Sequence, residues 1–416
     1  MSATEHEFDI VLYGATGFSG RLTAEYLART GTPARIALAG RSSERLLATR
    51  ASLGATAQNW PVIVADAAQP STLQAMANRT RVVLTTVGPY ARSGLPLVAA
   101  CAKAGTDYAD LTGEMIFGRD CIDRYHKQAG DSGSRIVLSC GFDSVPSDLN
   151  VYQLYRRAVN DGTGELGDTT LLLRSFRQTG VSGGTLASYL GAMRAASSDP
   201  EVRRLVNDPY TLTTERSAEP ELGAQPDFPW RRGRDIAPEL SDFWVGGFPQ
   251  GPYNSRIVRR SNALQGWPYG RRFRYAETMS LGKSIVAPAA SLAVTGAVST
   301  FVHLGNRYAR MLPQRWVYRS KTGGGPSARQ RNRGHYTMQT YTTTTTGARY
   351  LATFAQQCDS YQGTAVVLGE CGLALAFDRD RLSQLRGVLT PAAAMGDALL
   401  TRLPAAGVSM GTTRLA

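Results

Sequence analysis

The chain has 416 residues, of which 43% are hydrophobic, so it can bury the cores of two domains. Its five cysteines are few, odd in number and without C-x-x-C spacing, which argues against a disulfide framework or a zinc site, and we expect no metal. The N-terminus has neither the basic region nor the apolar core of a secretory signal, which favours a cytoplasmic protein.

The net charge of +13 needs an explanation, since arginines concentrate in the second half of the chain, among them Arg259, Arg260 and the cluster around Arg271. Such a field attracts anionic partners. No helix-turn-helix, zinc-finger or aromatic-plus-basic RNA-binding pattern accompanies the charge, so we do not expect nucleic acid. An acidic carrier-protein surface or an anionic membrane stays open, as does the alternative that the arginines only aid solubility.

Three glycines spaced three apart, Gly14, Gly17 and Gly20, follow the apolar residues 10–12. Residues 10–12 have the character of a buried strand, and residues 18–27 then follow a helical period. Between a strand and a helix, the first glycine makes a tight turn, the second lets backbone N–H groups approach a pyrophosphate, and the third allows close packing. This pattern predicts a bound dinucleotide.

A second apolar strand, residues 35–39, ends at Gly40 and is followed by Arg41, Ser42 and Ser43. A carboxylate at this strand end would accept hydrogen bonds from the ribose 2′-hydroxyl of NADH, whereas a cation with neighbouring hydroxyls accommodates a 2′-phosphate. The sequence therefore favours NADPH, the alternative being that Arg41 only solvates the strand end.

The first third of the chain alternates between strands and helices. Six strands are predicted, at residues 10–13, 36–39, 62–65, 82–85, 107–110 and 136–139. Strands joined by helical crossovers form a doubly wound parallel sheet of the α/β class, a Rossmann fold, and such sheets bind ligands at the carboxyl ends of their strands. We therefore predict a dinucleotide-binding domain over residues 1–147.

Two loops at these strand ends carry further candidates for the cofactor. Asp66, after the third strand, either accepts from an adenine amino group or caps the next helix. After the fourth strand, Val87 and Gly88 let the backbone pass close to the nicotinamide ribose. Tyr90 then projects near the reacting ring, unless it only packs in the cleft.

From about residue 150 the alternation ends. The mixture of elements predicts an α+β second domain over residues 148–383, with residues 384–416 packing back on the first domain. The elements predicted after residue 150 are helices at 151–159 and 180–196, a strand at 169–176, a hairpin at 336–354 and a C-terminal helix starting near Pro391.

Residues 284–305 carry no formal charge over about 22 positions, near the length that spans a bilayer. Proline, glycine and several hydroxyl side chains make the segment weakly hydrophobic, so we favour a buried helix or a hydrophobic surface patch over a spanning helix. An exposed patch there would receive a greasy substrate or make a peripheral contact with the inner face of the membrane.

Six separated motifs occur in order along the chain: GATGFSG, AGRS, TTVGPY, DLTGE, CGFDSVPSDL and GVLTPAAAMGDALL. Together they resemble the saccharopine dehydrogenase-like oxidoreductases. From about residue 8 to the C-terminus, including SGGTLASY, RRFRYAETMSLGKS and HYTMQTYTTTTTGARY, the chain is similar to the enoyl-reductase branch of that family. Those are the trans-acting enoyl reductases of phthiocerol and phenolphthiocerol dimycocerosate synthesis.

The resemblance implies an NADPH-dependent reductase that acts on a carbon–carbon double bond left by a polyketide synthase module. Its implied partners are the synthase or its acidic acyl carrier domain and a long-chain lipid. The expected cofactor-binding residues are Gly14, Ala15, Thr16, Gly17, Phe18, Gly20, Arg41, Ser42, Asp66, Val87 and Gly88.

No catalytic residue carries over from the resemblance. Reducing an enoyl thioester requires a proton donor and hydrogen-bond donors at the developing oxyanion. Our candidates are Tyr90 and Ser144, with Asp143 orienting them, while His335 and Tyr336 could enter from the second domain.

Two other functions stay open. A saccharopine-type amino-acid dehydrogenase would need convergent arginines for its carboxylates, which Arg174 and Arg177 or the Arg271 cluster could supply. A non-catalytic, membrane-associated scaffold that binds NADPH is the second.

Overall fold

The first of two β-sheets is parallel and has seven strands. The computed structural model describes residues 6–178, 199–227, 232–297 and 324–416. The strand order is β12-β6-β5-β4-β1-β2-β3, and each neighbouring pair is parallel. The strands are β1 (Phe8–Tyr13), β2 (Ile36–Gly40), β3 (Val62–Val64), β4 (Thr80–Thr85), β5 (Asp107–Ala109), β6 (Arg135–Val137) and β12 (Gly387–Leu389). The six predicted strands and the doubly wound fold are confirmed, and β12 is an additional strand that sequence reasoning missed.

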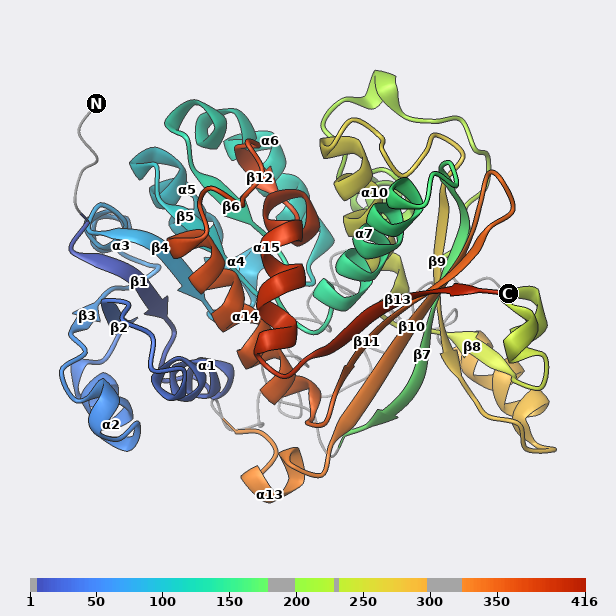
Figure 1. Ribbon diagram of the computed structural model, residues 1–416. Coiled ribbons are helices and arrows are strands. Elements are labelled where there is room, and N and C mark those ends of the chain that lie inside the picture. The colour runs from blue at the N-terminus through green and yellow to red at the C-terminus, as the bar shows by residue number, and fades with distance from the viewer. Residues whose placement is uncertain (1–5, 179–198, 228–231, 298–323) are drawn as a thin grey trace.

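Helices cover both faces of this sheet (Figure 1). Side chains alternate along each strand, so Leu12 faces one layer of helices and Val11 faces the other. The first layer holds α1 (Phe18–Arg29), α2 (Ser43–Ser52), α14 (Ser360–Phe377) and α15 (Pro391–Ala405). The second layer holds α3 (Pro70–Ala77), α5 (Leu95–Ala104) and α6 (Met115–Ser132), with the short α4 (Tyr90–Ser93) at a strand end.

The second sheet has six strands in the order β13-β11-β10-β7-β9-β8. Only β7 and β9 are parallel, and the predicted hairpin is confirmed as β10 and β11, which turn at Gly347 with φ +86°. The strands are β7 (Leu166–Arg177), β8 (Val245–Gly247), β9 (Arg274–Ser280), β10 (His335–Thr344), β11 (Arg349–Gln356) and β13 (Ser409–Leu415). Helices α7 (Val145–Asn160) and α10 (Gly251–Leu264) lie between the sheets, and their apolar residues join one core with both (Figure 1).

The remaining elements are short. They are α9 (Pro200–Asn207), α13 (Ala328–Arg331), and the 3₁₀ turns η1 (Ala55–Ala57), η2 (Arg216–Ala218), η3 (Gly233–Asp235) and η4 (Pro238–Leu240). Residues 287–297 are helical and lie beside β8, where Ser291 Oγ donates to Val245 O. No helix within the described residues is long and apolar enough to cross a membrane. The predicted helix at 180–196 and the second part of segment 284–305 lie outside the described residues.

The chain crosses between the sheets more often than the predicted domain boundaries of 148–383 and 384–416 imply. Helix α14 packs on the first sheet, so closely that a Cβ added at Gly372 would lie 2.7 Å from Leu84 of β4. Strand β13 pairs with β11 in the second sheet, whereas β12 and α15 return to the first. The domain boundaries stay a prediction, and part of the apolar face of β1 and β4 is covered by a helix that arrives late in the chain.

Candidate functional site

The turn between β1 and α1 has no room for side chains. Gly14 has φ +91°, in the region that favours glycine, and its N–H donates to Ala39 O over 2.9 Å. A Cβ at Gly20 would lie 2.1 Å from Gly14 O, and Gly17 N–H donates to that same carbonyl oxygen over 2.9 Å. The three glycines therefore bring strand and helix together, as the sequence pattern predicts.

The first turn of α1 is suited to an anion. Gly17 is its N-cap, no side chain caps it, and no acidic residue lies in its first turn. Free N–H groups and the helix dipole favour negative charge there. Val87, after β4, reaches the same turn, because a Cβ at Gly14 would lie 2.7 Å from Val87 Cγ2. The residues present fit a dinucleotide pyrophosphate, and those that surround this turn are Gly14, Ala15, Thr16, Gly17, Phe18, Gly20 and Val87.

A second polar group lies at the ends of β2 and β3. Arg41 is exposed, and Ser42 caps α2 by accepting from Arg45 N–H over 3.3 Å. Asp66 accepts from Ala68 N–H over 3.0 Å, so its carboxylate orders its own loop. Burial raises the pKa of the nearby Tyr13, and the charge of Asp66 raises it further, while that of Arg41 lowers it. The charges of Arg41 and Asp66 thus both reach the side chain of Tyr13, at the edge of the sheet where the adenosine end of the cofactor is expected.

Tyr90, a predicted catalytic residue, lies inside the protein. Its side chain is buried, its hydroxyl donates to Thr85 O over 3.1 Å and accepts from Leu111 N–H over 3.1 Å. Burial raises the pKa of Tyr90 well above the usual range. Glu114 accepts from the backbone N–H groups of Tyr90 and Ala91 over 2.9 and 2.8 Å. The loop after β4 and the loop after β5 therefore hold each other in place, and Tyr90 is part of this contact.

The candidate catalytic residue Asp143 accepts a hydrogen bond from a side chain of the second half of the chain. Gln250 Nε2 donates to its Oδ1 over 3.0 Å, and burial raises the pKa of Asp143 to about 6. The neighbouring Phe142 packs against both Phe176 of β7 and Tyr336 of β10, with ring centroids 6.0 and 4.4 Å apart. This cluster places Asp143 where the loop after β6 meets the second sheet.

Ser144 belongs to a buried polar network. Its hydroxyl donates to Asn254 Oδ1 over 2.9 Å, and Asn254 Nδ2 donates to Glu277 Oε2 over 3.0 Å. Tyr275 also donates to Glu277, over 2.8 Å. Because the hydroxyl proton of Ser144 is already engaged, this residue connects α7 to α10 rather than facing a ligand.

Residues from distant parts of the chain meet at the site; sequence reasoning proposed His335 and Tyr336 among them and missed Thr364 and Tyr361. Thr364 of α14 accepts from Phe142 N–H over 3.1 Å. Tyr361, also on α14, meets Phe18 edge to face at 5.2 Å. Tyr336 is fully buried and donates to Gln356, and His335 begins β10 opposite Arg177. Only long-range packing brings Thr364 and Tyr361 of α14 here, so local motifs carry no signal for these two residues.

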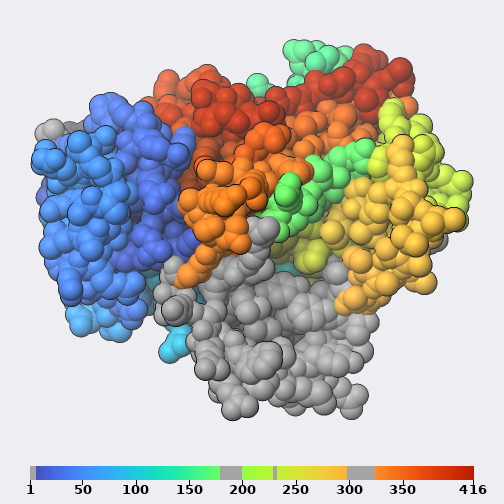
Figure 2. All heavy atoms as spheres, turned by 90° about the horizontal axis from the view of Figure 1, so that it is seen from below, coloured from blue at the N-terminus to red at the C-terminus, as the bar shows by residue number. Residues whose placement is uncertain are grey.

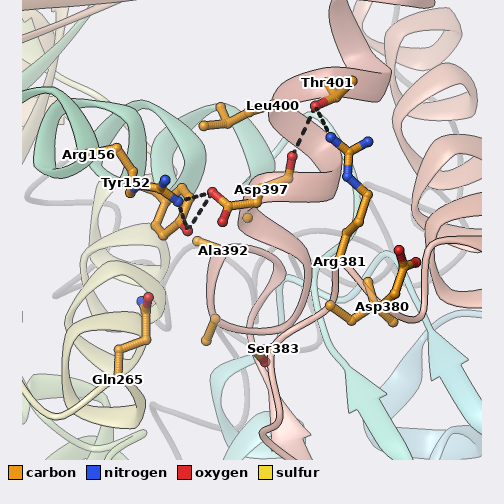
Figure 3. A pocket seen from close by; sticks show the side chains of 13 residues that line it. Tyr152, Arg156, Gln265, Asp380, Arg381, Ser383, Ala392, Asp397, Leu400 and Thr401 are labelled. Carbon is orange, nitrogen blue, oxygen red and sulfur yellow. Dashed lines mark hydrogen bonds and ion pairs between the residues drawn. The ribbon is translucent and has the colours of Figure 1, made fainter. Parts of the chain in front are cut away.

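A cavity of about 660 Å³ lies elsewhere, between α7, α15 and the loop at residues 380–383 (Figure 3). Two of its arginines are engaged with other lining residues: Arg156 pairs with Asp397, and Arg381 donates to Thr401 Oγ1 over 3.4 Å. Tyr152 donates to Asp397 Oδ1 over 2.9 Å. None of the predicted cofactor or catalytic residues lines this cavity. Within the described residues, no group of three His, Cys, Asp or Glu side chains could hold a metal ion.

The glycine turn on a doubly wound sheet defines a dinucleotide-binding oxidoreductase. Residues 10–137 match the family model of the saccharopine dehydrogenase NADP binding domain, which supports NADPH as the cofactor. The fold is similar to that of apo saccharopine dehydrogenase (L-Glu forming) from Saccharomyces cerevisiae, with a TM-score of 0.55 at 12% identity, covering 98% of this chain and 100% of that chain.

The sequence comparison is more specific than the fold. The chain is 71% identical over 417 residues to the trans-acting enoyl reductase of Mycobacterium tuberculosis and 69% identical to that of Mycobacterium leprae. Both alignments cover 100% of this chain and 100% of the relative. The chain belongs to the trans-acting enoyl reductases, which confirms the resemblance seen in its motifs.

Proposed function

We propose that this protein is an NADPH-dependent trans-acting enoyl reductase. It reduces a carbon–carbon double bond that a polyketide synthase module leaves during phthiocerol dimycocerosate and phenolic glycolipid (phenolphthiocerol) biosynthesis. The observation that carries the proposal is the full-length 71% identity to a protein of that name. The glycine turn and the strand-end Arg41 support the choice of cofactor.

We propose Asp143 as the proton donor. Bound NADPH supplies the hydride, so the chain must orient the enoyl thioester and deliver a proton to its α-carbon. A carboxyl with a pKa of about 6 still holds its proton in part near neutral pH, and Gln250 fixes its orientation. Tyr90 and Ser144 are less suited to this step, since their hydroxyl protons are committed to Thr85 O and Asn254 Oδ1.

The surface beside Asp143 favours an acyl substrate over a polycarboxylate. Phe176, stacked on Phe142, is 45% exposed and offers apolar contact. The Arg271 cluster lies at the other end of β7, because Arg274 pairs with Asp168, eight residues and roughly 25 Å from Phe176. Arg174 lies over the Phe243 ring at 3.7 Å. Arg174 and the Arg271 cluster therefore do not converge beside Asp143, and of the arginines considered for an amino-acid dehydrogenase Arg177 is the one adjacent to Phe176.

An assay with two substrates tests the reaction. NADPH oxidation should follow addition of an enoyl thioester carried on the acyl carrier domain of the synthase, and should not follow addition of the oxo-acid and amino-acid precursors of saccharopine. The opposite pattern would favour the amino-acid dehydrogenase. NADPH binding without turnover of any enoyl thioester would favour the scaffold. Mass spectrometry of lipids from cells lacking the protein should find an added double bond.

We further propose that the segment at residues 284–305 makes peripheral contact with a lipid surface. Its described part exposes Ile285, Val286 and Leu292, with exposed fractions of 97%, 65% and 68%. The helical part of the segment is joined to β8, where Gly247 N–H donates to Thr295 Oγ1 over 3.2 Å. An apolar, firmly supported surface of this kind favours contact with lipid.

Vesicle binding tests this contact. Changing Ile285 and Leu292 together to Ser should reduce co-sedimentation with anionic phospholipid vesicles. Changing the exposed Val159 on α7 to Ser is the matched control and should leave binding as in the wild type. Equal binding by all three proteins would contradict the proposal.

A further inference from the structure

The segment at residues 324–334, which precedes β10, lies directly against the beginning of α1. A Cβ at Gly325 would lie 2.4 Å from Phe18 Cζ, so any larger residue there would require the Phe18 ring to move. Phe18 is the first residue of α1, immediately after Gly17. Figure 2 shows the segment in orange, between the blue N-terminal elements and the second sheet. An element attached to the second sheet therefore touches the turn that fits the pyrophosphate.

Arg331 carries positive charge to this contact. Its guanidinium carbon lies 5.7 Å from the centroid of the Phe18 ring, and its Nη1 donates to Pro326 O over 2.7 Å. Its Nε is buried and has no hydrogen-bond partner in the described part of the chain. A buried donor without a partner costs free energy, which a ligand that accepts from it can recover.

No carboxylate of the described residues pairs with Arg331. The nearby Asp359 accepts from Gln362 N–H over 2.9 Å, and its N–H donates to Arg331 O over 3.1 Å. Burial raises the pKa of Asp359, and the charge of Arg331 opposes that shift without forming an ion pair. The guanidinium thus remains available to an anion beside a helix start that has no acidic residue in its first turn.

We propose that Arg331 is a cofactor-binding residue that contacts the pyrophosphate of NADPH from the side of the second sheet. The segment at residues 324–334 and the Phe18 ring hold the guanidinium in place. Guanidinium groups suit this task, since they form charge-assisted hydrogen bonds with phosphate oxygens. This inference rests on the cofactor of the proposed function and is independent of the substrate.

Binding measurements on three variants test the proposal. The dissociation constants of NADPH, NADH and adenosine 2′-monophosphate are measured by fluorescence titration on the full chain. Arg331→Gln should weaken NADPH and NADH by the same factor, about tenfold or more. It should leave adenosine 2′-monophosphate unchanged, because that ligand lacks the pyrophosphate. Arg331→Lys should bind both dinucleotides with intermediate affinity.

The control is Arg333→Gln, an exposed arginine of the same segment, which should bind all three ligands as the wild type does. Wild-type affinity of Arg331→Gln for both dinucleotides would overturn the proposal, as would a loss confined to NADPH. Loss of adenosine 2′-monophosphate binding in both Arg331 variants would also overturn it, because Arg331 would then be a structural residue. No measurement uses an enoyl substrate, so failure of the proposed reaction is distinguished from failure of this inference.

Discussion

Arg41 is the residue on which cofactor choice depends at the end of β2. Its exposed guanidinium and the carboxylate of Asp66 follow the carboxyl ends of the neighbouring parallel strands β2 and β3, at one edge of the sheet. Changing Arg41 to Ala should weaken NADPH about tenfold or more while leaving NADH nearly unchanged, since only NADPH carries the 2′-phosphate. Calorimetric titration of both dinucleotides checks this, and equal losses would show that Arg41 does not bind that phosphate.

Asp143 should control the pH dependence of turnover. Its protonated form is the proposed donor, so kcat should fall as pH rises through about 6, the pKa to which burial raises this carboxyl. Asp143→Asn should lower kcat by about 10²-fold or more and abolish this dependence, with the NADPH dissociation constant unchanged.

Gln250→Met is a matched variant for this test. Removing the amide N–H, which favours the ionised carboxylate, should raise the pKa of Asp143 and move the fall in kcat to higher pH. An Asp143→Asn enzyme with wild-type kcat would contradict a role for this carboxyl in proton delivery.

At the scale of elements, Asp148 joins three helices. It lies on α7, accepts from Ser261 Oγ of α10 over 2.5 Å and from Ala392 N–H of α15 over 2.8 Å. Burial raises its pKa to about 7, so the folded state holds a proton that the unfolded chain releases near pH 4. The stabilisation from this proton is complete below about pH 4 and is lost as pH rises to about 7.

Asp148→Asn should remove this pH dependence. The amide keeps an acceptor for Ala392 N–H and stays neutral at every pH. As pH rises from 5 to 7, the free energy of unfolding of the wild type should fall relative to that of the variant, by at most about 1.4 kcal/mol per pH unit. Urea unfolding at several pH values measures it, with the exposed Asp131→Asn of α6 as control. A difference that is constant with pH would contradict the assignment.

Elements with strong local patterns could be predicted from sequence, and those defined by long-range pairing could not. The glycine turn and β1 depend on residues within a short window, which carries their signal. Strand β12 has three residues and is a strand only because β6 offers a free edge. The partners of the Tyr90 hydroxyl, Thr85 O at the end of β4 and Leu111 N–H in the loop after β5, could not be predicted from sequence. Such partners are visible only after folding.

At the scale of the whole molecule, the net charge is less available to partners than composition indicates. Arg259 and Arg260 are buried in α10 and donate to backbone carbonyls, Arg259 to Tyr275 O and Arg260 to Leu212 and Val388. Burial lowers the pKa of Arg260 to about 9. These arginines connect the sheets internally, so an acidic partner must meet other cations.

Strand β13 should stabilise the whole molecule, because it closes the edge of β11. Strand β13 pairs with β11 from Arg349–Leu415 at one end to Ala355–Ser409 at the other, and deleting residues 409–416 removes all of these pairs. Each cross-strand pair contributes roughly 0.2–1 kcal/mol to the free energy of unfolding. We expect a lower Tm, measured by calorimetry, and aggregation through the exposed edge, measured by light scattering. Arg414→Ser, which keeps the strand, is the control, and a deletion variant with wild-type Tm would contradict the expectation.

The late position of α14 and β12 in the chain has a consequence for folding during synthesis. Residues 10–137 contain the glycine turn and six strands, yet the sheet face formed by Leu12 and Leu84 is covered by a helix made more than two hundred residues later. A ribosome that has released only residues 10–137 presents a sheet on which α1 and α2 cover part of this face, while the part that α14 and α15 cover is bare and β6 lacks its partner β12. The NADP-binding region should therefore reach its native state only after nearly the entire chain has emerged.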